Sequence, residues 1–359
     1  MNYLVNRQFA DSVEGYLESP WPGEMAGRIH VVAYQDASAL RELPAGTTLL
    51  SDHERFTPAQ RELARRVWRA LGEAGVPRLN DPDRVLRRAP LLDALHRAGI
   101  NAFRAVPATE PLEGLRYPVF VREANEHTGT LTRLLGSRRE LGRSLALLTR
   151  FGGLRPEDLL VVEFCDTRVG GTGPFPKYAV FRVGDRLIPR YLEFGEHWVV
   201  KSDSRSVTQE LVERELDFMR RNPHEETLRR VFDLAGIDYG RADYGVLDGR
   251  VQVWEINTNP RIGPRSRARG GPSPVARADR VLRREAKEIF HASFREALKA
   301  IDRTDPGRRV PVAVDPDLRR RVQLETAGFW WRDRVKAGLR ELRRAPTLRG
   351  LARRLADRV

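Results

Sequence analysis

The spacing of apolar residues divides the first third of the chain into alternating strands and helices. Segments 30–34 and 47–50 are short apolar runs typical of buried strands, and an amphipathic helix opened by Thr57-Pro58-Ala59-Gln60 is predicted over 57–71. A further helix, capped by residues 79–82, is predicted up to Gly99. This alternation predicts an α/β protein.

Strand patterns dominate the middle of the chain. Strands are predicted over 117–122 and 159–166, and residues 177–190 form a hairpin that turns at Gly184-Asp185. A second hairpin starts near Arg241, turns at Asp248-Gly249 and returns through 251–255. Beyond it we expect a loop rich in Gly, Pro, Arg and Ser over 263–280, an amphipathic helix over 281–300 and a linker over 310–314.

The second hairpin carries three oxygen ligands at the ends of its strands. Asp243 lies in the first strand and Glu255 ends the return strand, so the two carboxylates are expected to meet across the ladder. Asn257 lies two residues further, on the same side if the strand stays extended. Magnesium takes a few carboxylates, amide oxygens and water, so the hairpin predicts a metal site. The alternative is a surface hairpin with solvated acids and a turn over 257–260.

This stretch resembles the metal-binding end of the ATP-grasp family, whose strands close with an acid and then Glu-x-Asn. The resemblance implies that Asp243, Glu255 and Asn257 hold magnesium on the phosphates of ATP, with Asn259 a further candidate. Two ions are expected, with manganese as an alternative. Residues 79–100 look like the segment by which the family leaves its N-terminal domain, so the resemblance covers about 79–262, roughly half of the chain.

The same resemblance assigns an ATP site. Arg88 and the arginine that ends the strand over 117–122 would face the phosphates, the loop over 123–130 would fold over them, and Glu163 would face the adenine amino group. The expected ATP-binding residues are Arg88, Arg122, His127, Thr128, Gly129, Glu163, Phe164, Cys165, Asp166 and Lys201. The alternatives are an ordinary strand-to-helix connection for the loop, a solvated Glu163 and a surface Lys201.

Two features depart from the family pattern. Positions 88 and 122 are Arg where the family usually has Lys, which keeps the charge but changes the donor geometry. Lys177 occupies the place where an acid commonly holds the ribose hydroxyls, which leaves Asp166 as a substitute. The metal ligands are intact, which favours an active enzyme.

The resemblance implies a ligase that forms carbon–nitrogen bonds. A substrate carboxylate would attack the γ-phosphate of ATP, and an amine or other nucleophile would capture the acyl phosphate. Arg241 matches the arginine that steadies the oxyanion in D-alanine:D-alanine ligases, and the alternative is a surface arginine paired with Asp238. A kinase-like phosphoryl transferase and a non-catalytic nucleotide- or partner-binding protein remain open. The identity of the acid and of the amine, and the oligomeric state, are left undetermined.

Composition limits the remaining possibilities. A chain of 359 residues suits two or three lobes, its single Cys165 excludes an internal disulfide, and no apolar run is long enough to span a membrane. A cytoplasmic protein is therefore expected. The net charge of +14 is concentrated after residue 317, where thirteen basic residues face four acidic ones, so general nucleic-acid binding is disfavoured.

The expected organisation is an ATP-grasp fold in four parts. These are an N-terminal α/β domain over 1–80, nucleotide-binding lobes over 81–265, a loop and helix packed on that core over 266–316, and a basic helical tail over 317–359. Arginines of the loop over 261–280 are expected to contact an anionic small-molecule or peptide carboxylate. The tail places Leu348, Leu351, Ala352 and Leu355 on one helical face, and docking on its own protein is favoured over peripheral contact with anionic membranes or RNA.

Overall fold

The computed structural model describes residues 1–36, 41–126, 129–200, 208–263 and 277–328. An N-terminal lobe is built on a parallel sheet in the order β2-β1-β4-β5. Its elements are β1 (Asn2–Val5), α1 (Asp11–Leu17), β2 (His30–Ala33), β4 (Thr48–Leu50), α2 (Pro58–Glu73) and β5 (Arg78–Leu79). The strands predicted over 30–34 and 47–50 are thus confirmed.

Helix α2 begins where its capping signal predicts. The Thr57 side chain accepts a hydrogen bond from the Gln60 amide, and the Gln60 side chain accepts one from the Thr57 amide. Leu63, Val67 and Leu71 are buried on one face of the helix, where they help to form the core of the N-terminal lobe.

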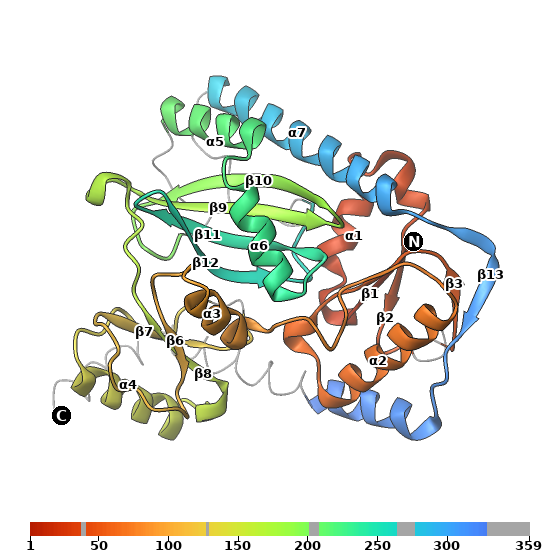
Figure 1. Cartoon of the computed structure of the whole chain (residues 1–359), viewed down its shortest axis with the longest axis horizontal. Helices are drawn as coiled ribbons and strands as arrows, with labels where there is room; N and C mark the ends of the chain where they lie inside the picture. The colour runs from red at the N-terminus through yellow and green to blue at the C-terminus, as the bar shows by residue number, and fades with distance from the viewer. Residues whose placement is uncertain (37–40, 127–128, 201–207, 264–276, 329–359) are drawn as a thin grey trace, which may run out of the picture.

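The segment predicted to be a linker is part of this lobe instead. Strand β13 (Asp305–Pro311) pairs antiparallel with β3 (Glu42–Ala45), and Val310, Val312 and Val314 are buried in the same core. The linker prediction over 310–314 is therefore wrong, because alternate valines there supply an apolar face for this lobe. In Figure 1 the chain reaches β13, at the right, from α7 (Arg277–Ile301) at the top.

A small antiparallel sheet, in the order β6-β8-β7, forms the second lobe. Its strands are β6 (Ala105–Pro107), β7 (Val119–Glu123) and β8 (Leu159–Glu163), and α4 (Arg138–Arg150) packs against β7. Helix α3 (Arg88–Arg97) leads into this lobe and begins later than predicted. Asn80 does not cap it: its backbone is left-handed, and its side chain binds the backbone at Leu50, Asp238 and Tyr239.

The third lobe is a four-stranded antiparallel sheet in the order β10-β9-β11-β12. It contains β9 (Phe175–Val183), β10 (Arg186–Gly195), α5 (Gln209–Arg221), α6 (Glu225–Ala235), β11 (Tyr239–Leu247), β12 (Arg250–Asn257) and α7 (Arg277–Ile301). Both predicted hairpins are confirmed, and Asp248 and Gly249 take the positive φ values that their tight turn requires. Helix α7 begins at Arg277, inside the stretch predicted as a loop, and packs on β9 and β10 through Phe290 and Phe294 against Phe181.

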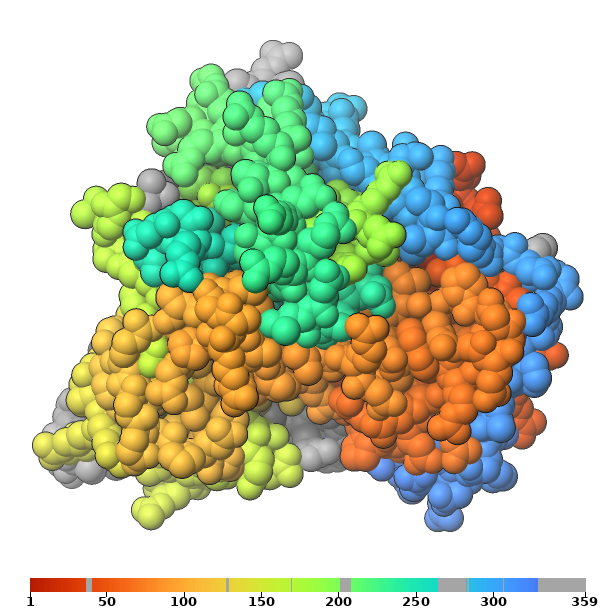
Figure 2. Space-filling model, in the orientation of Figure 1, coloured from red at the N-terminus to blue at the C-terminus, as the bar shows by residue number. Residues whose placement is uncertain are grey.

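The beginning of the basic tail packs on the protein itself. Residues 316–328 are helical, and Leu318 and Val322 are buried in the N-terminal core. Glu325 Oε2 accepts a hydrogen bond of 2.9 Å from the Ala59 amide at the start of α2. Figure 2 shows this C-terminal part, in blue, beside the orange N-terminal lobe. Residues 329–359, and with them the predicted apolar face around Leu351, lie outside the described residues.

Among the described helices, none is long and apolar enough to cross a membrane. The mixed α/β class predicted from the sequence is confirmed by the sheets and the helices that cover them.

Candidate nucleotide and metal site

The hairpin of β11 and β12 brings the predicted metal ligands together. Asp243 pairs with Glu255 across the ladder, and Arg241 pairs with Asn257. Residues two apart on a strand, and residues opposite each other in a ladder, share one face of the sheet, so all four side chains project to the same side. The expected pairing of Asp243 with Glu255 across the ladder is therefore confirmed, and it includes a β-bulge between Asp243 and Tyr244.

Asp243 is held by cations from its own sheet. Its carboxylate lies 2.7 Å from Nε of Arg241 and 3.2 Å from Nζ of Lys177, and it accepts a 3.5 Å hydrogen bond from the Tyr191 hydroxyl. Burial works to lower the pKa of Lys177, but nearby negative groups, Asp243 first, raise it above its usual value. The alternative pairing of Arg241 with Asp238 is wrong, because Asp238 lies beside the amide of Asn80 instead.

Glu255 is held by cations from outside that sheet. Arg88, at the start of α3, and Arg122, on β7, both bind its Oε2, the latter at 3.0 Å. Burial lowers the pKa of Arg122 to about 10, helped by the neighbouring charge of Arg88. The two arginines therefore share one carboxylate, and the buried Nε of Arg122 has no hydrogen-bond partner within the described parts of the chain.

The donor set fits a magnesium ion that is shared with phosphate groups. Two carboxylates and an amide oxygen are present, whereas no group of three or more His, Cys, Asp or Glu is placed to hold a metal among the residues that the structure describes. Magnesium is commonly bound through one or two carboxylates and completed by water and nucleotide phosphates. Four cations face these two carboxylates, so the cluster carries excess positive charge suited to an anionic ligand.

The loop expected to cover ATP is described in part. Gly129 has φ +94°, a conformation that other residues rarely adopt, and beyond it Leu131 donates from its amide to the Val121 carbonyl. The chain thus turns back onto β7, beside Arg122. His127 and Thr128 lie outside the described residues, as does Lys201, so their expected contacts with ATP stay predictions.

Glu163, expected to face adenine, has a buried carboxylate that binds the protein. It accepts hydrogen bonds from the amides of Arg104 and Arg116, at 3.0 and 2.8 Å, and from the Arg116 guanidinium. The Phe164 amide donates to the Pro118 carbonyl. These hydrogen bonds connect the end of β8 to the segments around Arg104 and Arg116. The expected contact of Glu163 with the adenine amino group therefore stays a prediction.

The next two residues of the expected hinge differ in their surroundings. The carboxylate of Asp166 is paired with Arg168, 2.5 Å from its Nη2. Burial raises the pKa of the Cys165 thiol to about 11, so this thiol stays protonated at neutral pH.

An aromatic cluster beside this hinge was not predicted. The Trp198 ring lies 4.7 Å from Phe120 and 5.8 Å from Phe164, and Phe164 lies 6.4 Å from Phe175, centroid to centroid. Such rings offer stacking surfaces for a nucleobase. The four aromatics are scattered between 120 and 198, and no periodicity connects them, so only the folded chain places them together.

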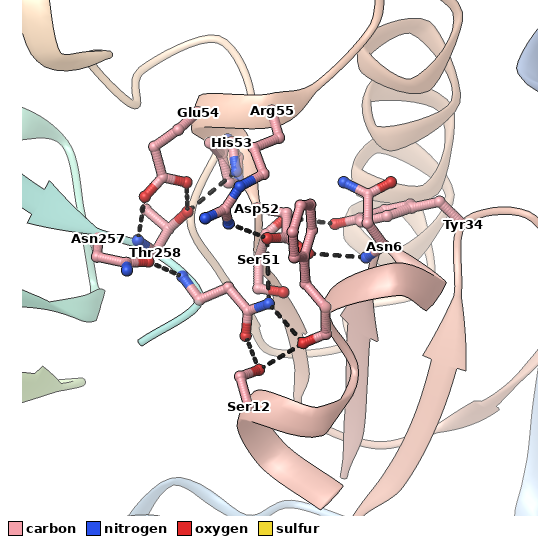
Figure 3. A network of polar contacts seen from close by, with 12 residues as sticks. Asn6, Ser12, Tyr34, Ser51, Asp52, His53, Glu54, Arg55, Asn257 and Thr258 are labelled. Carbon is pink, nitrogen blue, oxygen red and sulfur yellow. Dashed lines mark hydrogen bonds and ion pairs between the residues drawn. The ribbon is translucent and has the colours of Figure 1, made fainter. Parts of the chain in front are cut away.

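The turn after β12 is hydrogen-bonded to a loop of the N-terminal lobe. Glu54 accepts hydrogen bonds from the Thr258 amide at 2.6 Å and from its hydroxyl at 2.7 Å, while the Thr258 hydroxyl accepts one from the His53 amide (Figure 3). Figure 3 shows Asn257 and Thr258 facing this loop. The N-terminal lobe thereby fixes the backbone next to a predicted metal ligand.

Asn259 is a centre of the same network and not an exposed ligand. Its side-chain Nδ2 donates to Asp52 Oδ1 at 3.0 Å, and its backbone amide donates to Asn257 Oδ1 at 2.8 Å. Its side-chain oxygen accepts hydrogen bonds from the hydroxyls of Ser12 and Tyr3. Asp52 has a left-handed backbone, φ +62°. Burial raises the pKa of Asp52 to about 6, although the charge of nearby Arg55 opposes the shift.

The loop expected to bind an anionic substrate lies largely outside the described residues, including Arg265, Arg267 and Arg269. Arg261, at its start, is paired with Asp11 at 2.5 Å.

No protein-family model matches the chain, and no curated protein matches it. Solved structures give weak similarities. D-alanine–D-alanine ligase from Bacillus anthracis complexed with ATP is 12% identical, with 82% of this chain and 98% of that chain covered and a TM-score of 0.44. L-amino acid ligase from Bacillus licheniformis is 14% identical, covering 83% and 73%, with a TM-score of 0.41. D-alanine–D-alanine ligase from Coxiella burnetii is 14% identical, covering 71% and 70%, with a TM-score of 0.37.

The identities and TM-scores are low, so the functional proposal below rests on the residues of this chain.

Proposed function

We propose that this chain is an ATP- and magnesium-dependent ATP-grasp ligase that activates a substrate carboxylate as an acyl phosphate and passes the acyl group to an amine. The observation that carries the proposal is the pairing of Asp243 with Glu255 on one strand face, opposite Arg88 and Arg122 from two other elements. Carboxylates for a hard cation and a cationic wall are the two requirements of a triphosphate site.

The ion pairs suggest how the site accepts its ligands. Arg88 and Arg122 neutralise Glu255, and Arg241 and Lys177 neutralise Asp243. Arg88 and Arg122 would turn from Glu255 to the oxygens of a bound triphosphate, and the carboxylate of Glu255 would then be available to hold magnesium. Magnesium bound by Asp243, Glu255 and Asn257 supplies charge neutralisation at the phosphates. The exchange keeps each buried charge paired before and after binding.

The nucleoside end would lie on the second lobe. The end of β8 at Glu163 and the rings of Phe164, Phe120 and Trp198 form one region, in which an adenine ring can stack. Gly129 would let the backbone approach the phosphates, with His127, Thr128 and Lys201 as further predicted contacts.

In the proposed reaction a carboxylate oxygen of the substrate attacks the γ-phosphorus, forming a new O–P bond while the bond to the leaving ADP oxygen breaks. The amine then attacks the acyl carbon, phosphate leaves with the bonding electron pair, and the amine loses a proton. Arg241 faces this region from β11 and would stabilise the oxyanion of the tetrahedral intermediate.

The test is ADP and phosphate release from ATP and magnesium with pools of carboxylic acids, including amino acids, with and without amines. Hydroxylamine is added in a parallel series because it traps an acyl phosphate as a hydroxamate. A ligase releases ADP and phosphate and forms hydroxamate. A kinase-like enzyme forms ADP and a phosphorylated product without hydroxamate, and a binding protein retains ATP without turnover; either result contradicts the proposal.

A further inference from the structure

Arg190 occupies an irregular position of β10, close to the proposed site. Pro189 pairs with Val180 and Tyr191 with Ala179, so Arg190 is the extra residue of a β-bulge. A bulge redirects the side chains around it and is frequent beside active sites. Tyr191, the next residue, reaches Asp243, and its ring centroid lies 5.6 Å from the Arg241 guanidinium.

The Arg190 guanidinium is confined but incompletely satisfied. It lies 4.2 Å from the centre of the Phe290 ring, and Nη2 donates to the Ile262 carbonyl at 3.2 Å. Nε and Nη1 have no hydrogen-bond partner in the described parts of the protein, yet they are not among its fully buried unsatisfied atoms. These two donors are therefore open to a further acceptor.

Arg190 differs from the other arginines of this sheet and its surroundings. Arg182 and Arg241 each bind a carboxylate within 3 Å, and Arg122 reaches Glu255 at 3.0 Å. Arg190 has no carboxylate within ion-pair distance in the described ranges. Burial lowers the pKa of Arg190 to about 10, helped by repulsion from Arg241 and opposed by attraction from Tyr191, Glu215 and Glu193. A half-buried cation with no directly paired carboxylate is stabilised by an anion that binds it.

We propose that Arg190 binds a second anionic group of the substrate, a carboxylate or a phosphate that is not consumed in the reaction. The inference rests on the proposed ligase function. The activated carboxylate becomes the carbonyl of an acyl phosphate, whose negative charge lies on the phosphoryl oxygens, and then the carbonyl of a neutral amide, so it cannot neutralise Arg190 throughout turnover. A group that stays anionic can, and the planar guanidinium fork with open Nε and Nη1 suits bidentate binding of a carboxylate or phosphate. The substrate class is therefore an acid with an additional negative charge.

The first test measures anion binding without turnover. Thermal unfolding of the full chain is followed with magnesium and a non-hydrolysable ATP analogue, with added malonate or inorganic phosphate against chloride at matched ionic strength. We expect one of the two anions to raise the Tm of the wild type and the shift to disappear in Arg190→Gln. The control Arg229→Gln removes an exposed arginine of α6 that pairs with Glu225, and it should keep the shift. A Tm shift with malonate alone indicates that the second anionic group of the substrate is a carboxylate, and a Tm shift with phosphate alone indicates that it is a phosphate.

No Tm shift in the wild type, or an equal Tm shift in Arg190→Gln, overturns the anion site.

The second test compares ADP release with pairs of acids of which one member carries an additional anionic group, namely glutamate against glutamine, aspartate against asparagine, and O-phosphoserine against serine. We expect the charged member to be preferred, and Arg190→Gln to raise its KM about 10- to 100-fold while the KM of ATP changes less than about twofold. Partial recovery in Arg190→Lys would match a charge contact without the fork.

The two tests separate the two proposals. If the anion shift depends on Arg190 but no acid stimulates ADP release, the ligase function fails and the anion site stands. If acids stimulate ADP release and Arg190→Gln keeps the preference for the charged member, the ligase stands and the role of Arg190 is wrong.

Discussion

Asp243 and Glu255 lie directly opposite each other across the β11–β12 ladder, yet cations from different parts of the chain neutralise them. Lys177, on the neighbouring strand, holds Asp243, whereas Arg88 and Arg122, from α3 and β7, hold Glu255. Arg88 and Arg122 therefore come from a different lobe from the β11–β12 hairpin. The pair therefore marks the junction of two lobes, where a ligand that competes for these cations would bind.

The first prediction concerns Glu255→Gln. With magnesium present, ATP affinity should fall more than about 10-fold. Loss of a residue that only orients a metal ligand already lowers metal affinity about 10-fold or more, and Glu255 is proposed to be a ligand itself. In EDTA the variant should bind ATP at least as tightly as the wild type, because Arg88 and Arg122 are no longer held by a carboxylate. Isothermal titration calorimetry under both conditions measures the two effects.

The matched control is Glu285→Gln, which removes an exposed carboxylate paired with Arg220 on α5. Alanine is unsuitable at 255, because two enclosed arginines would be left facing a cavity. Equal magnesium dependence of ATP binding in Glu255→Gln and wild type would show that Glu255 is not a metal ligand.

The second prediction tests the aromatic cluster. Trp198→Ala should weaken ATP binding about 10-fold, because stacking of a base on an aromatic ring contributes about 1–3 kcal/mol. Binding of inorganic tripolyphosphate should not change, since Trp198 contacts Phe120 and Phe164 and not the charged cluster. Phe151→Ala, at an exposed aromatic that ends α4, serves as the control. Equal losses for both ligands would place the effect in the fold and not in adenine binding.

A third prediction concerns Glu54, which receives two hydrogen bonds from Thr258 next to Asn257. Glu54→Gln keeps one acceptor and loses the charge, so the backbone of this turn should shift. We expect the magnesium concentration at half-maximal ATP binding to rise about 10- to 100-fold. Glu73→Gln, at an exposed position at the end of α2, should leave it unchanged. The idea fails if Glu54→Gln alters thermal stability alone and the magnesium midpoint stays at the wild-type value.

The fourth prediction is a pH dependence that comes from His291, a buried residue of α7. Its ring stacks on Trp21 at 4.5 Å, and its Nδ1 is buried without a partner among the described residues. Burial lowers the pKa of His291 to about 3, against 6.5 in the unfolded chain. Below pH 6.5 the unfolded state takes up a proton that the folded state refuses, so stability falls as the pH decreases toward 3.

His291→Phe keeps an aromatic ring and removes the titration. We expect the variant to lose less stability than the wild type between pH 6.5 and 5, by about 2 kcal/mol, as measured by urea unfolding at each pH. His53, whose pKa is lowered to about 4 by burial, keeps part of the acid sensitivity in both proteins. Parallel stability curves for wild type and variant would contradict the assignment.

The last prediction concerns the start of the basic tail. A chain that ends at Asp317 lacks the buried Leu318 and Val322, whereas a chain that ends at Gly328 keeps them. Burial of two such side chains stabilises by about 3–6 kcal/mol, so the shorter chain should unfold at a clearly lower temperature. Calorimetry of the two truncations checks this. Equal melting temperatures would show that the segment 318–328 adds nothing to the core.

Local patterns in the sequence determined the two hairpins and helix α2. A strand has a side-chain period of two and a tight turn has a fixed length, so Asp248-Gly249 sets the pairing from Leu247 with Arg250 to Tyr244 with Val253. Continued without a break, this register would place Asp243 opposite Trp254, and a β-bulge between Asp243 and Tyr244 places it opposite Glu255 instead. Thr57 and Gln60 likewise start α2 through contacts four residues apart or closer. These are short-range constraints, and a linear sequence contains them in full.

Contacts between distant segments were decided only by the tertiary structure. Nothing in the sequence indicates that residues 305–311 pair with β3, that Trp198 contacts Phe120, or that Glu54 binds Thr258. The partners of a buried charge depend on which groups the lobes bring within reach, because desolvation penalises every unpaired ion and rewards any counterion nearby. The sequence therefore determined which residues can bind a metal and a phosphate, and the packing of the lobes decided which cations hold them and left Arg190 without a carboxylate.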